Sequence, residues 1–376
     1  MEKFENFKIA LVHDFLIYYG GAEKVLEVLA EMFPQAPIYT LLYDKEKMRG
    51  KFEDREIHTS FLQKFPKFLR KRFRWFLPLL PTAPETFDLR EFDLVISTSG
   101  AWCKGIVTKL NTIHVAYIHS PMRFVWDYNE RYLKENRKEK IRFLLRPILN
   151  YLRIWDKMAA DRPDYLIANS CYTQERIKKY YGKESVVIYP PADIFTDKNP
   201  SPTLPFKKGE SGYFLIVSRL SSYKRIDVAV NAFNKLDLPL IIIGEGNQKK
   251  YLESFAGENV KILGWQSEEK RQWYYKNARA LVAVSVEDFG IAPVEAMSYG
   301  VPVVALRDGG FLETIVEGKT GEFFDAPTVE VLADGVRRFL ENESSYDKEK
   351  IKNRAKEFSK EKFMSEFQKF LENIEK

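Results

Sequence analysis

The sequence has few of the residues on which disulfide-stapled and zinc-dependent proteins rely. Its 376 residues include only two cysteines, Cys103 and Cys171, and four histidines that are scattered along the chain. Two cysteines cannot form a disulfide framework or a cysteine-based zinc site. We therefore expect a protein of a reducing compartment that is not a zinc enzyme.

Long apolar runs are also absent. No run reaches the roughly 18 residues that a membrane-spanning helix needs. The first residues are charged at Glu2, Lys3, Glu5 and Lys8, and no small-residue cleavage site follows the next apolar run, so we predict no secretory signal. Hydrophobic residues make up 45% and charged residues 30%, which excludes collagen-like and disordered chains. These features predict a globular, cytoplasmic protein.

The positive charge is concentrated in one part of the chain. The formal net charge is +6, and the thirty residues from Phe61 to Arg90 hold seven basic and two acidic residues. The rest of the chain is therefore close to neutral. A local basic region predicts an anionic partner at one place on the surface.

Short apolar runs alternate with amphipathic stretches in two halves of the chain. Strands are expected at 8–13, 37–42, 93–99, 112–118 and 165–168, and again at 213–218, 239–243, 260–263, 280–284 and 302–305. Such alternation is typical of a parallel sheet with helices on both faces. We predict an N-terminal Rossmann-like domain over 1–189, a proline-rich linker over 190–212, a second Rossmann-like domain over 213–345 and a closing helical segment over 346–376. Two doubly wound α/β domains bind ligands beyond the carboxyl ends of their strands, and we expect these ends to face each other across a cleft.

The run from Glu287 to Glu295 carries the strongest signal for a ligand site. It follows an expected strand, and we predict that Pro293 opens a helix with Glu295 in its first turn. Gly290 allows a ligand to approach the backbone closely, and the amides of a helix start suit an anion. Two carboxylates there can accept hydrogen bonds from vicinal hydroxyls. Alternatively, Glu295 is only a good first-turn residue and Glu287 a solvated loop residue.

Cations and glycines follow the first strand of each half. Arg219 and Lys224 flank a strand-to-helix turn, which suits a diphosphate, although two surface cations can also simply solvate a turn. Gly20 and Gly21 precede the first helix, where the backbone can pass under a phosphate or merely turn tightly. His119 ends an expected strand, a position that favours the ligand side over the core. His13 and Asp14 end the first strand in the same way and are weaker candidates.

Together, these motifs resemble the family-4 retaining glycosyltransferases of the GT-B fold. The resemblance covers nearly the whole chain, and the Glu287–Glu295 run is its most specific part. The stretch 119–127 is similar to that of bacterial mannosyltransferases that build surface polysaccharides from GDP-mannose. The resemblance implies transfer of a hexose, mannose, from a nucleotide-diphosphate sugar to a glycan or lipid-linked acceptor. It implies no cofactor and no metal, because cationic side chains and helix N-termini replace the metal.

The resemblance also implies residue roles. Arg219 and Lys224 would neutralise the leaving diphosphate, and His119 would lie beside the transferred sugar. Glu287 would hold the sugar hydroxyls, and Glu295 would hold the ribose. The implied catalytic residues are His119, Glu287, Arg219 and Lys224. The implied donor-binding residues are Gly20, Gly21, Gly264, Trp265, Phe289, Gly290, Ile291 and Glu295.

A basic aromatic segment at 61–75 interleaves cations with rings, as expected of a segment on an anionic bilayer. Its membrane or acceptor residues are predicted to be Lys64, Lys67, Arg70, Lys71, Arg72, Arg74 and Trp75. The stretch 137–153, again basic with Phe143, Leu144, Leu145 and Leu149, is expected to form a second wall. Alternatively, the rings are core residues and the cations are merely solvated. No recognition motif accompanies the charge, so a nucleic acid is not expected.

These features predict a peripheral protein at the inner face of the cell membrane. Two other functions remain open. One is a GT-B sugar-nucleotide epimerase, which would share the nucleotide site. The other is a non-catalytic sugar-nucleotide-binding protein, which has no use for both carboxylates and the cationic pair. The motifs leave the sugar, base, acceptor and linkage open.

Overall fold

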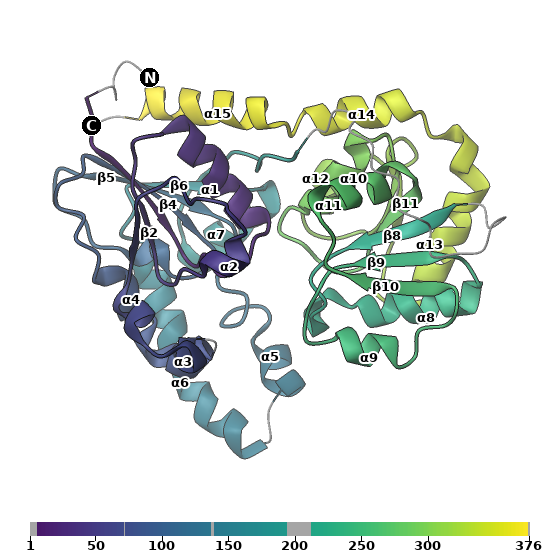
Figure 1. Ribbon diagram of the computed structural model, residues 1–376, viewed down its shortest axis with the longest axis horizontal. Helices are drawn as coiled ribbons and strands as arrows, with labels where there is room; N and C mark the ends of the chain where they lie inside the picture. The colour runs from purple at the N-terminus through teal and green to yellow at the C-terminus, as the bar shows by residue number, and fades with distance from the viewer. Residues whose placement is uncertain (1–5, 71, 137–138, 194–211, 375–376) are drawn as a thin grey trace. The chain divides into compact units, whose positions relative to one another are not determined.

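A computed structural model describes residues 6–70, 72–136, 139–193 and 212–374. The chain divides into two compact units. Unit 1 comprises residues 1–191 and 363–376, and unit 2 comprises residues 192–362. Each unit is built around one parallel sheet (Figure 1). The predicted linker over 190–212 lies mostly outside the described residues.

Unit 1 holds a seven-stranded parallel sheet in the order β3-β2-β1-β4-β5-β6-β7. Its strands are β1 (Ile9–His13), β2 (Ile38–Thr40), β3 (Ile57–Thr59), β4 (Leu94–Ser99), β5 (Ile113–Ile118), β6 (Tyr165–Ala168) and β7 (Val186–Val187). Every residue of β4 and β5 is buried, as expected for strands that are covered on both faces.

Helices cover both faces of this sheet. The helical elements are α1 (Gly21–Met32), α2 (Lys45–Met48), η2 (Phe61–Lys64), α3 (Lys67–Arg70), η3 (Phe73–Leu79), α4 (Thr82–Glu85), η4 (Cys103–Gly105), α5 (Asn129–Asn136), α6 (Glu139–Ala159), α7 (Cys171–Tyr181) and α15 (Lys360–Asn373). Side chains of α1 and α15 share one core with the sheet. Side chains of η2, η3, α4 and α6 form the core on the other face.

Unit 2 repeats the architecture with six parallel strands in the order β10-β9-β8-β11-β12-β13. Its strands are β8 (Tyr213–Val217), β9 (Leu240–Ile243), β10 (Val260–Gly264), β11 (Ala278–Ala283), β12 (Val303–Leu306) and β13 (Gly321–Phe324). Its helical elements are η5 (Ser222–Lys224), α8 (Ile226–Leu236), α9 (Lys249–Glu253), α10 (Glu268–Lys276), α11 (Ile291–Ser298), α12 (Phe311–Thr314), α13 (Val329–Asn342), η6 (Glu343–Ser345) and α14 (Lys348–Lys356). The predicted fold class, two doubly wound α/β domains, is confirmed.

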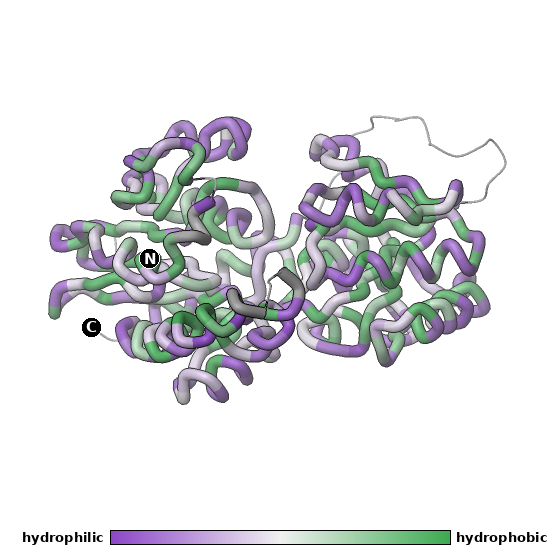
Figure 2. Tube along the Cα trace, turned by 90° about the horizontal axis from the view of Figure 1, so that it is seen from below, coloured by the Kyte–Doolittle hydropathy of each residue, from purple (hydrophilic) through white to green (hydrophobic). Residues whose placement is uncertain are grey.

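Hydrophobic stretches run through each unit, and hydrophilic residues lie mostly along its outside (Figure 2). The residues of the predicted closing segment form α14 and α15. In α15, Phe363, Phe367 and Leu371 are buried in the core of unit 1. Within the described ranges, no helix is long and apolar enough to cross a bilayer.

Candidate functional site

The strand order of unit 2 reverses between β8 and β11, which are neighbours in the sheet. A crevice forms at such a switch point beyond the carboxyl ends of the two strands. The loop after β8 carries Arg219 and Lys224, and the loop after β11 carries Glu287. Two motifs about sixty residues apart in the sequence therefore meet at one place in this sheet.

An ion pair joins these two loops. The Lys224 ammonium contacts the Glu287 carboxylate, and the Ser285 hydroxyl donates a hydrogen bond of 3.0 Å to the same carboxylate oxygen. The Lys224 side chain is 12% exposed and that of Glu287 is 25% exposed. Arg219 is exposed, and its guanidinium donates to the Tyr223 hydroxyl at 2.8 Å. The Lys224 ammonium can bind an anion, and the Glu287 carboxylate can accept hydrogen bonds from the hydroxyl groups of a ligand.

The backbone around Glu287 is fixed by glycines. Gly290 has φ +89°, in the left-handed region, where a residue with a side chain would be strained. A Cβ on Gly309 would lie 2.3 Å from the Glu287 carbonyl oxygen, so only glycine allows this approach. The Gly310 amide donates to the same oxygen at 3.0 Å. Gly309 and Gly310 are not predicted from the sequence, although Asp308-Gly309-Gly310 follows a strand.

Glu295 lies deeper than predicted. Helix α11 begins at Ile291, so Pro293 is its third residue and Glu295 its fifth. The prediction that Pro293 opens the helix, with Glu295 in the first turn, is therefore wrong. Glu295 is 4% exposed and accepts a 2.7 Å hydrogen bond from the Tyr275 hydroxyl. Burial, and then the Glu295 carboxylate, raise the pKa of Tyr275 well above its usual value, so the phenol stays a donor.

The remaining predicted donor-side residues lie at ends of elements. Phe289 is buried and packs edge-on against Phe358 at 5.4 Å, so it can offer a ligand only its backbone. Ile291 is the first residue of α11. Gly264 ends β10, and its carbonyl accepts a hydrogen bond from Gly244 at 2.9 Å. Trp265, directly after it, is half exposed.

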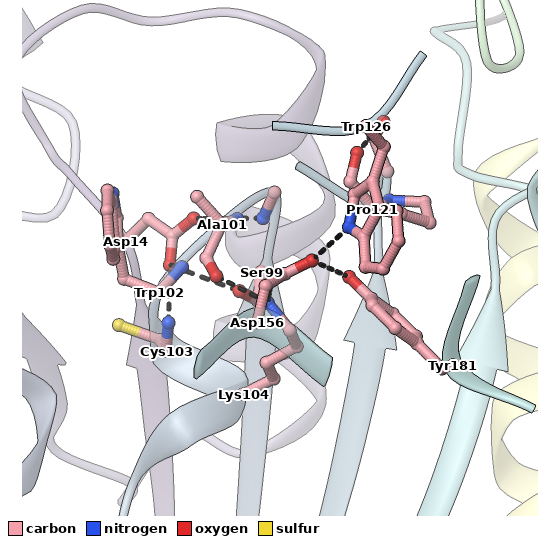
Figure 3. Close-up of polar contacts among 12 residues, drawn as sticks. Asp14, Ser99, Ala101, Trp102, Cys103, Lys104, Pro121, Trp126, Asp156 and Tyr181 are labelled. Atoms are coloured by element: carbon pink, nitrogen blue, oxygen red, sulfur yellow. Dashed lines mark hydrogen bonds and ion pairs between the residues drawn. The ribbon is translucent and has the colours of Figure 1, made fainter. Parts of the chain in front are cut away.

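The strand order of unit 1 reverses between β1 and β4, and the Asp14 side chain occupies this switch point. The Asp14 carboxylate accepts hydrogen bonds of 2.7–3.0 Å from the backbone N–H groups of Gly100, Ala101, Trp102 and Cys103 (Figure 3). These four amides form a backbone anion site, here called the Asp14 nest, which the Asp14 carboxylate of the same chain occupies. Asp14, a weaker candidate by sequence, thus has a structural position.

His13 and Glu23 form a buried polar pair beside this nest. The two ring nitrogens of His13 contact the Thr98 hydroxyl at 2.5 Å and the Glu23 carboxylate at 3.4 Å. Gly20 precedes α1 with an extended backbone, φ −157°, and Gly21 is the first residue of that helix. Gly20 therefore uses no left-handed conformation. Its predicted position under a phosphate stays a prediction.

His119 directly follows β5. Its amide donates to the Ser99 carbonyl at 2.9 Å, and its carbonyl accepts from the Asn169 side chain at 3.0 Å. The His119 ring lies edge-on to Tyr117 at 5.3 Å and 6.4 Å from the ring of His13. These contacts fix the backbone of His119 at the end of β5.

A buried carboxylate that the sequence did not reveal supports the segment after His119. Asp156 on α6 is fully buried and pairs with the Lys104 ammonium (Figure 3). It also accepts hydrogen bonds from the Trp126 indole at 2.7 Å and the Tyr181 hydroxyl at 2.9 Å. Because Trp126 lies in the 119–127 motif, part of this motif serves to anchor its own loop.

Arg176 on α7 holds the same motif from another side. It is 5% exposed and donates to the Ser120 hydroxyl at 2.7 Å and to the Asp127 carboxylate at 3.0 Å. No sequence pattern distinguishes Arg176 or Asp156 from other charged residues of a helix. Only the three-dimensional packing identifies them.

The basic aromatic segment is only partly exposed. Lys64, Lys67 and Arg72 are exposed and Arg70 is half-buried, whereas Lys71 and the side chains of Arg74 and Trp75 lie outside the described residues. Phe61 and Phe65 pack against the core of unit 1, and Phe68 remains 64% exposed. The alternative interpretation, in which the rings belong to the core, therefore holds for Phe61 and Phe65.

The described part of the chain contains no cluster of three or more His, Cys, Asp or Glu residues that could hold a metal ion. Among the described residues, neither cysteine forms a disulfide; Cys103 is buried and Cys171 is exposed. The β8–β11 switch point offers a ligand its cations, its carboxylates and the amides at the start of α11.

Comparison with protein families gives two matches that together span most of the chain. Residues 19–194 match the model described as Glycosyltransferase Family 4. Residues 201–358 match the model described as Glycosyl transferases group 1.

Individual relatives are distant. The chain is 22% identical over 365 residues to an uncharacterised glycosyltransferase of Methanocaldococcus jannaschii, which covers 94% of this chain and 93% of that protein. It is 27% identical over 205 residues to a GDP-mannose-dependent phosphatidylinositol monomannoside mannosyltransferase of Mycobacterium tuberculosis, covering 48% of this chain and 53% of the relative. The chain thus matches about half the length of this mannosyltransferase.

A solved structure shares the fold. The sucrose-phosphate synthase of Thermosynechococcus elongatus superposes with a TM-score of 0.71 at 16% identity, over 96% of this chain and 98% of that one. At this identity the likeness shows the fold alone.

Proposed function

Because the chain belongs to the GT-B glycosyltransferases that combine a family 4 domain with a group 1 domain, we propose that it transfers mannose from GDP-mannose, with retention of configuration. The acceptor is a lipid-linked or other glycan in the synthesis of a polysaccharide or glycolipid. Mannose and GDP are supported by the distant mannosyltransferase relative and by the 119–127 motif. Two glycosyltransferase domains favour transfer over epimerisation or binding without catalysis.

The observation that carries this proposal is the Lys224–Glu287 pair at the switch point of unit 2. Lys224 and Arg219 neutralise the diphosphate, which accumulates charge as the glycosidic bond breaks. Glu287 accepts hydrogen bonds from hydroxyls of the transferred sugar, and Glu295 from the ribose. Gly264 and Trp265 border the base, while the amides of Phe289, Gly290 and Ile291 face the sugar.

We also propose roles for three residues of unit 1. His119 would act on the transferred sugar, and the backbone at Gly20 and Gly21 would bind the diphosphate. The Asp14 nest supports a donor site in unit 2, because the amides at the switch point of unit 1 are already satisfied.

We further propose a peripheral position at the inner face of the membrane. The exposed cations Lys64, Lys67 and Arg72, together with Arg70 and Lys71, would contact anionic headgroups. Arg74 and Trp75 belong to the same proposed surface. A lipid-linked diphosphate acceptor would then meet the enzyme at the bilayer.

A transfer assay tests the proposal. Labelled GDP-mannose is incubated with the protein and a membrane lipid extract, with and without excess chelator, and the anomeric configuration of the product is read by NMR. We expect a lipid-soluble α-mannoside in both cases. A product formed from donor alone would support the epimerase, and loss of activity with chelator would contradict metal-free catalysis.

A further inference from the structure

Helix α6 turns a row of large apolar side chains toward solvent. Its residues Leu149, Leu152 and Ala159 are buried in unit 1. Five others are exposed: Phe143 by 76%, Leu144 by 68%, Tyr151 by 48%, Ile154 by 59% and Met158 by 59%. We call these five residues the α6 stripe. Single exposed apolar residues are ordinary, whereas a row on one element needs an explanation.

The stripe is continuous along the helix. At about 100° per residue, its five members fall within an arc of roughly 100°, which adjoins the arc that packs on the sheet. At 1.5 Å per residue, the stripe from Phe143 to Met158 is about 22 Å long. One side of α6 is buried in unit 1. The described residues of the chain do not cover this second apolar side.

Positive charge borders the stripe. Arg146, Asn150 and Lys157 occupy the adjoining exposed arc, and Arg146 is paired with Glu130 at 2.8 Å. The carboxylate of Asp156 on the same helix is buried against Lys104. Helix α6 also packs against η3, which continues the basic aromatic segment. Phe68 and Leu79 of that region are exposed as well.

We propose that the α6 stripe is the apolar contact of this protein with an anionic bilayer. The stripe would lie at the boundary of headgroups and acyl chains, with Arg146, Lys157 and the exposed cations Lys64, Lys67 and Arg72 at the headgroups. The proposal rests on the proposed membrane-side acceptor and deepens it. It assigns the apolar part of the affinity to α6, because Phe61 and Phe65 pack on the core instead.

The charges argue against a second copy as the occupant of the stripe. A two-fold contact centred on Tyr151 would pair antiparallel helices and bring Arg146 of one copy close to Lys157 of the other. Such like-charge neighbours oppose association. An anionic bilayer instead attracts Lys157, and its headgroups can take over Arg146 from Glu130.

Vesicle flotation of the full chain tests the proposal. The stripe variant is Phe143→Gln/Ile154→Gln, and its matched control is Val186→Gln/Tyr251→Gln, which removes two similarly exposed apolar side chains from other elements. The probe is a vesicle of phosphatidylcholine and phosphatidylglycerol. Each lost side chain should cost about tenfold in partition, so the stripe variant should bind about 100-fold more weakly. The control should bind like the wild type.

Salt separates the stripe from the cations. At about 1 M salt the Debye length is ~3 Å and headgroup attraction is screened, so the difference between stripe variant and control should persist. Equal vesicle binding of the stripe variant and the wild type would overturn the proposal. So would a lipid-free dimer of the wild type that the stripe variant dissociates.

Failure of this proposal can be distinguished from failure of the proposed function. Transfer from GDP-mannose to a short soluble acceptor should be the same in the stripe variant and the wild type. If GDP-mannose is no donor, the proposed function falls, and the flotation result still decides the role of the stripe.

Discussion

At the candidate donor site, the Lys224 and Glu287 side chains bind each other with the same groups that would bind the donor. Lys224 is paired with Glu287 before any ligand arrives. An incoming diphosphate must share or take over this ammonium, and an incoming sugar must share the carboxylate. The pair therefore links binding of the two halves of the donor.

Replacement of Glu287 should separate turnover from nucleotide binding. We expect Glu287→Ala to lower kcat for transfer about 100-fold or more, because a positioned group acting in the transition state is lost. GDP affinity should stay equal or rise, since Lys224 is released. Glu341→Ala, at an exposed carboxylate of α13, is the control. Calorimetry of GDP binding beside kcat measures both, and an equal loss in the two would assign Glu287 to the nucleotide instead.

His114 should make stability depend on pH. It is fully buried beside Ser97, and burial, followed by the charge of Arg162, lowers the pKa of His114 to about 3. The unfolded chain binds this proton near pH 6.5 and the folded chain does not, so stability is lost as pH falls from about 6.5 toward 3.

The measurement is urea unfolding of the wild type and His114→Gln. Below pH 6.5 the wild type should lose up to about 1.4 kcal/mol per pH unit more than the variant. Parallel pH profiles of the two proteins would show that His114 does not contribute.

At the scale of elements, one buried ion pair supports four segments. Asp156 on α6 contacts Lys104 of η4, Trp126 of the 119–127 loop and Tyr181 of α7. A buried charge that loses its partner is strongly destabilising, whereas removal of both charges is often tolerated.

Lys104→Met should therefore cost about 3–5 kcal/mol of unfolding free energy. The double variant Lys104→Met/Asp156→Asn should lose less than Lys104→Met alone, because an amide can still accept from Trp126 and Tyr181 and carries no charge. Urea unfolding of the three proteins measures this. A double variant at least as unstable as Lys104→Met would contradict the role of the unpaired charge.

The positions of the central strands along the chain could be predicted from the sequence, whereas three edge strands could not. β3, β7 and β13 end their sheets and were missed. Central parallel strands are buried on both faces and read as apolar runs, but β3 and β7 contain no fully buried residue. β13 is buried, yet its glycine start and Glu322 break the run.

The loops that carry the candidate site residues could be predicted from the sequence, but the contacts between their side chains could not. The residue types after β8 and β11 identify both loops. Ligands bind where the strand order of such a sheet reverses, which predicts that the two loops are neighbours. The pairing of Lys224 with Glu287, the burial of Glu295 against Tyr275 and the Asp156 cluster depend on side-chain packing. No local pattern encodes that packing.

At the scale of the whole molecule, the basic segment should supply the salt-sensitive part of membrane binding. Each surface cation contributes about 1 kcal/mol against an acidic leaflet. Reversal of Arg70, Lys71 and Arg72 to Glu should abolish sedimentation with anionic vesicles at low salt. GDP binding should be unchanged, because Arg219 and Lys224 lie in unit 2. If the wild-type protein ignores anionic vesicles at low salt, a soluble acceptor becomes the better interpretation.

The central claim is that a nucleotide-diphosphate sugar binds at the β8–β11 switch point. Its most direct test is the thermal midpoint of the full chain with GDP, GDP-mannose, UDP, UDP-glucose and guanosine. A ligand at about 100 times its Kd stabilises the native state by ~2.7 kcal/mol. We predict that GDP and GDP-mannose raise the midpoint most, and that the effect is lost in Arg219→Ala/Lys224→Ala. No shift with any nucleotide diphosphate, or a shift that this variant retains, would contradict the account.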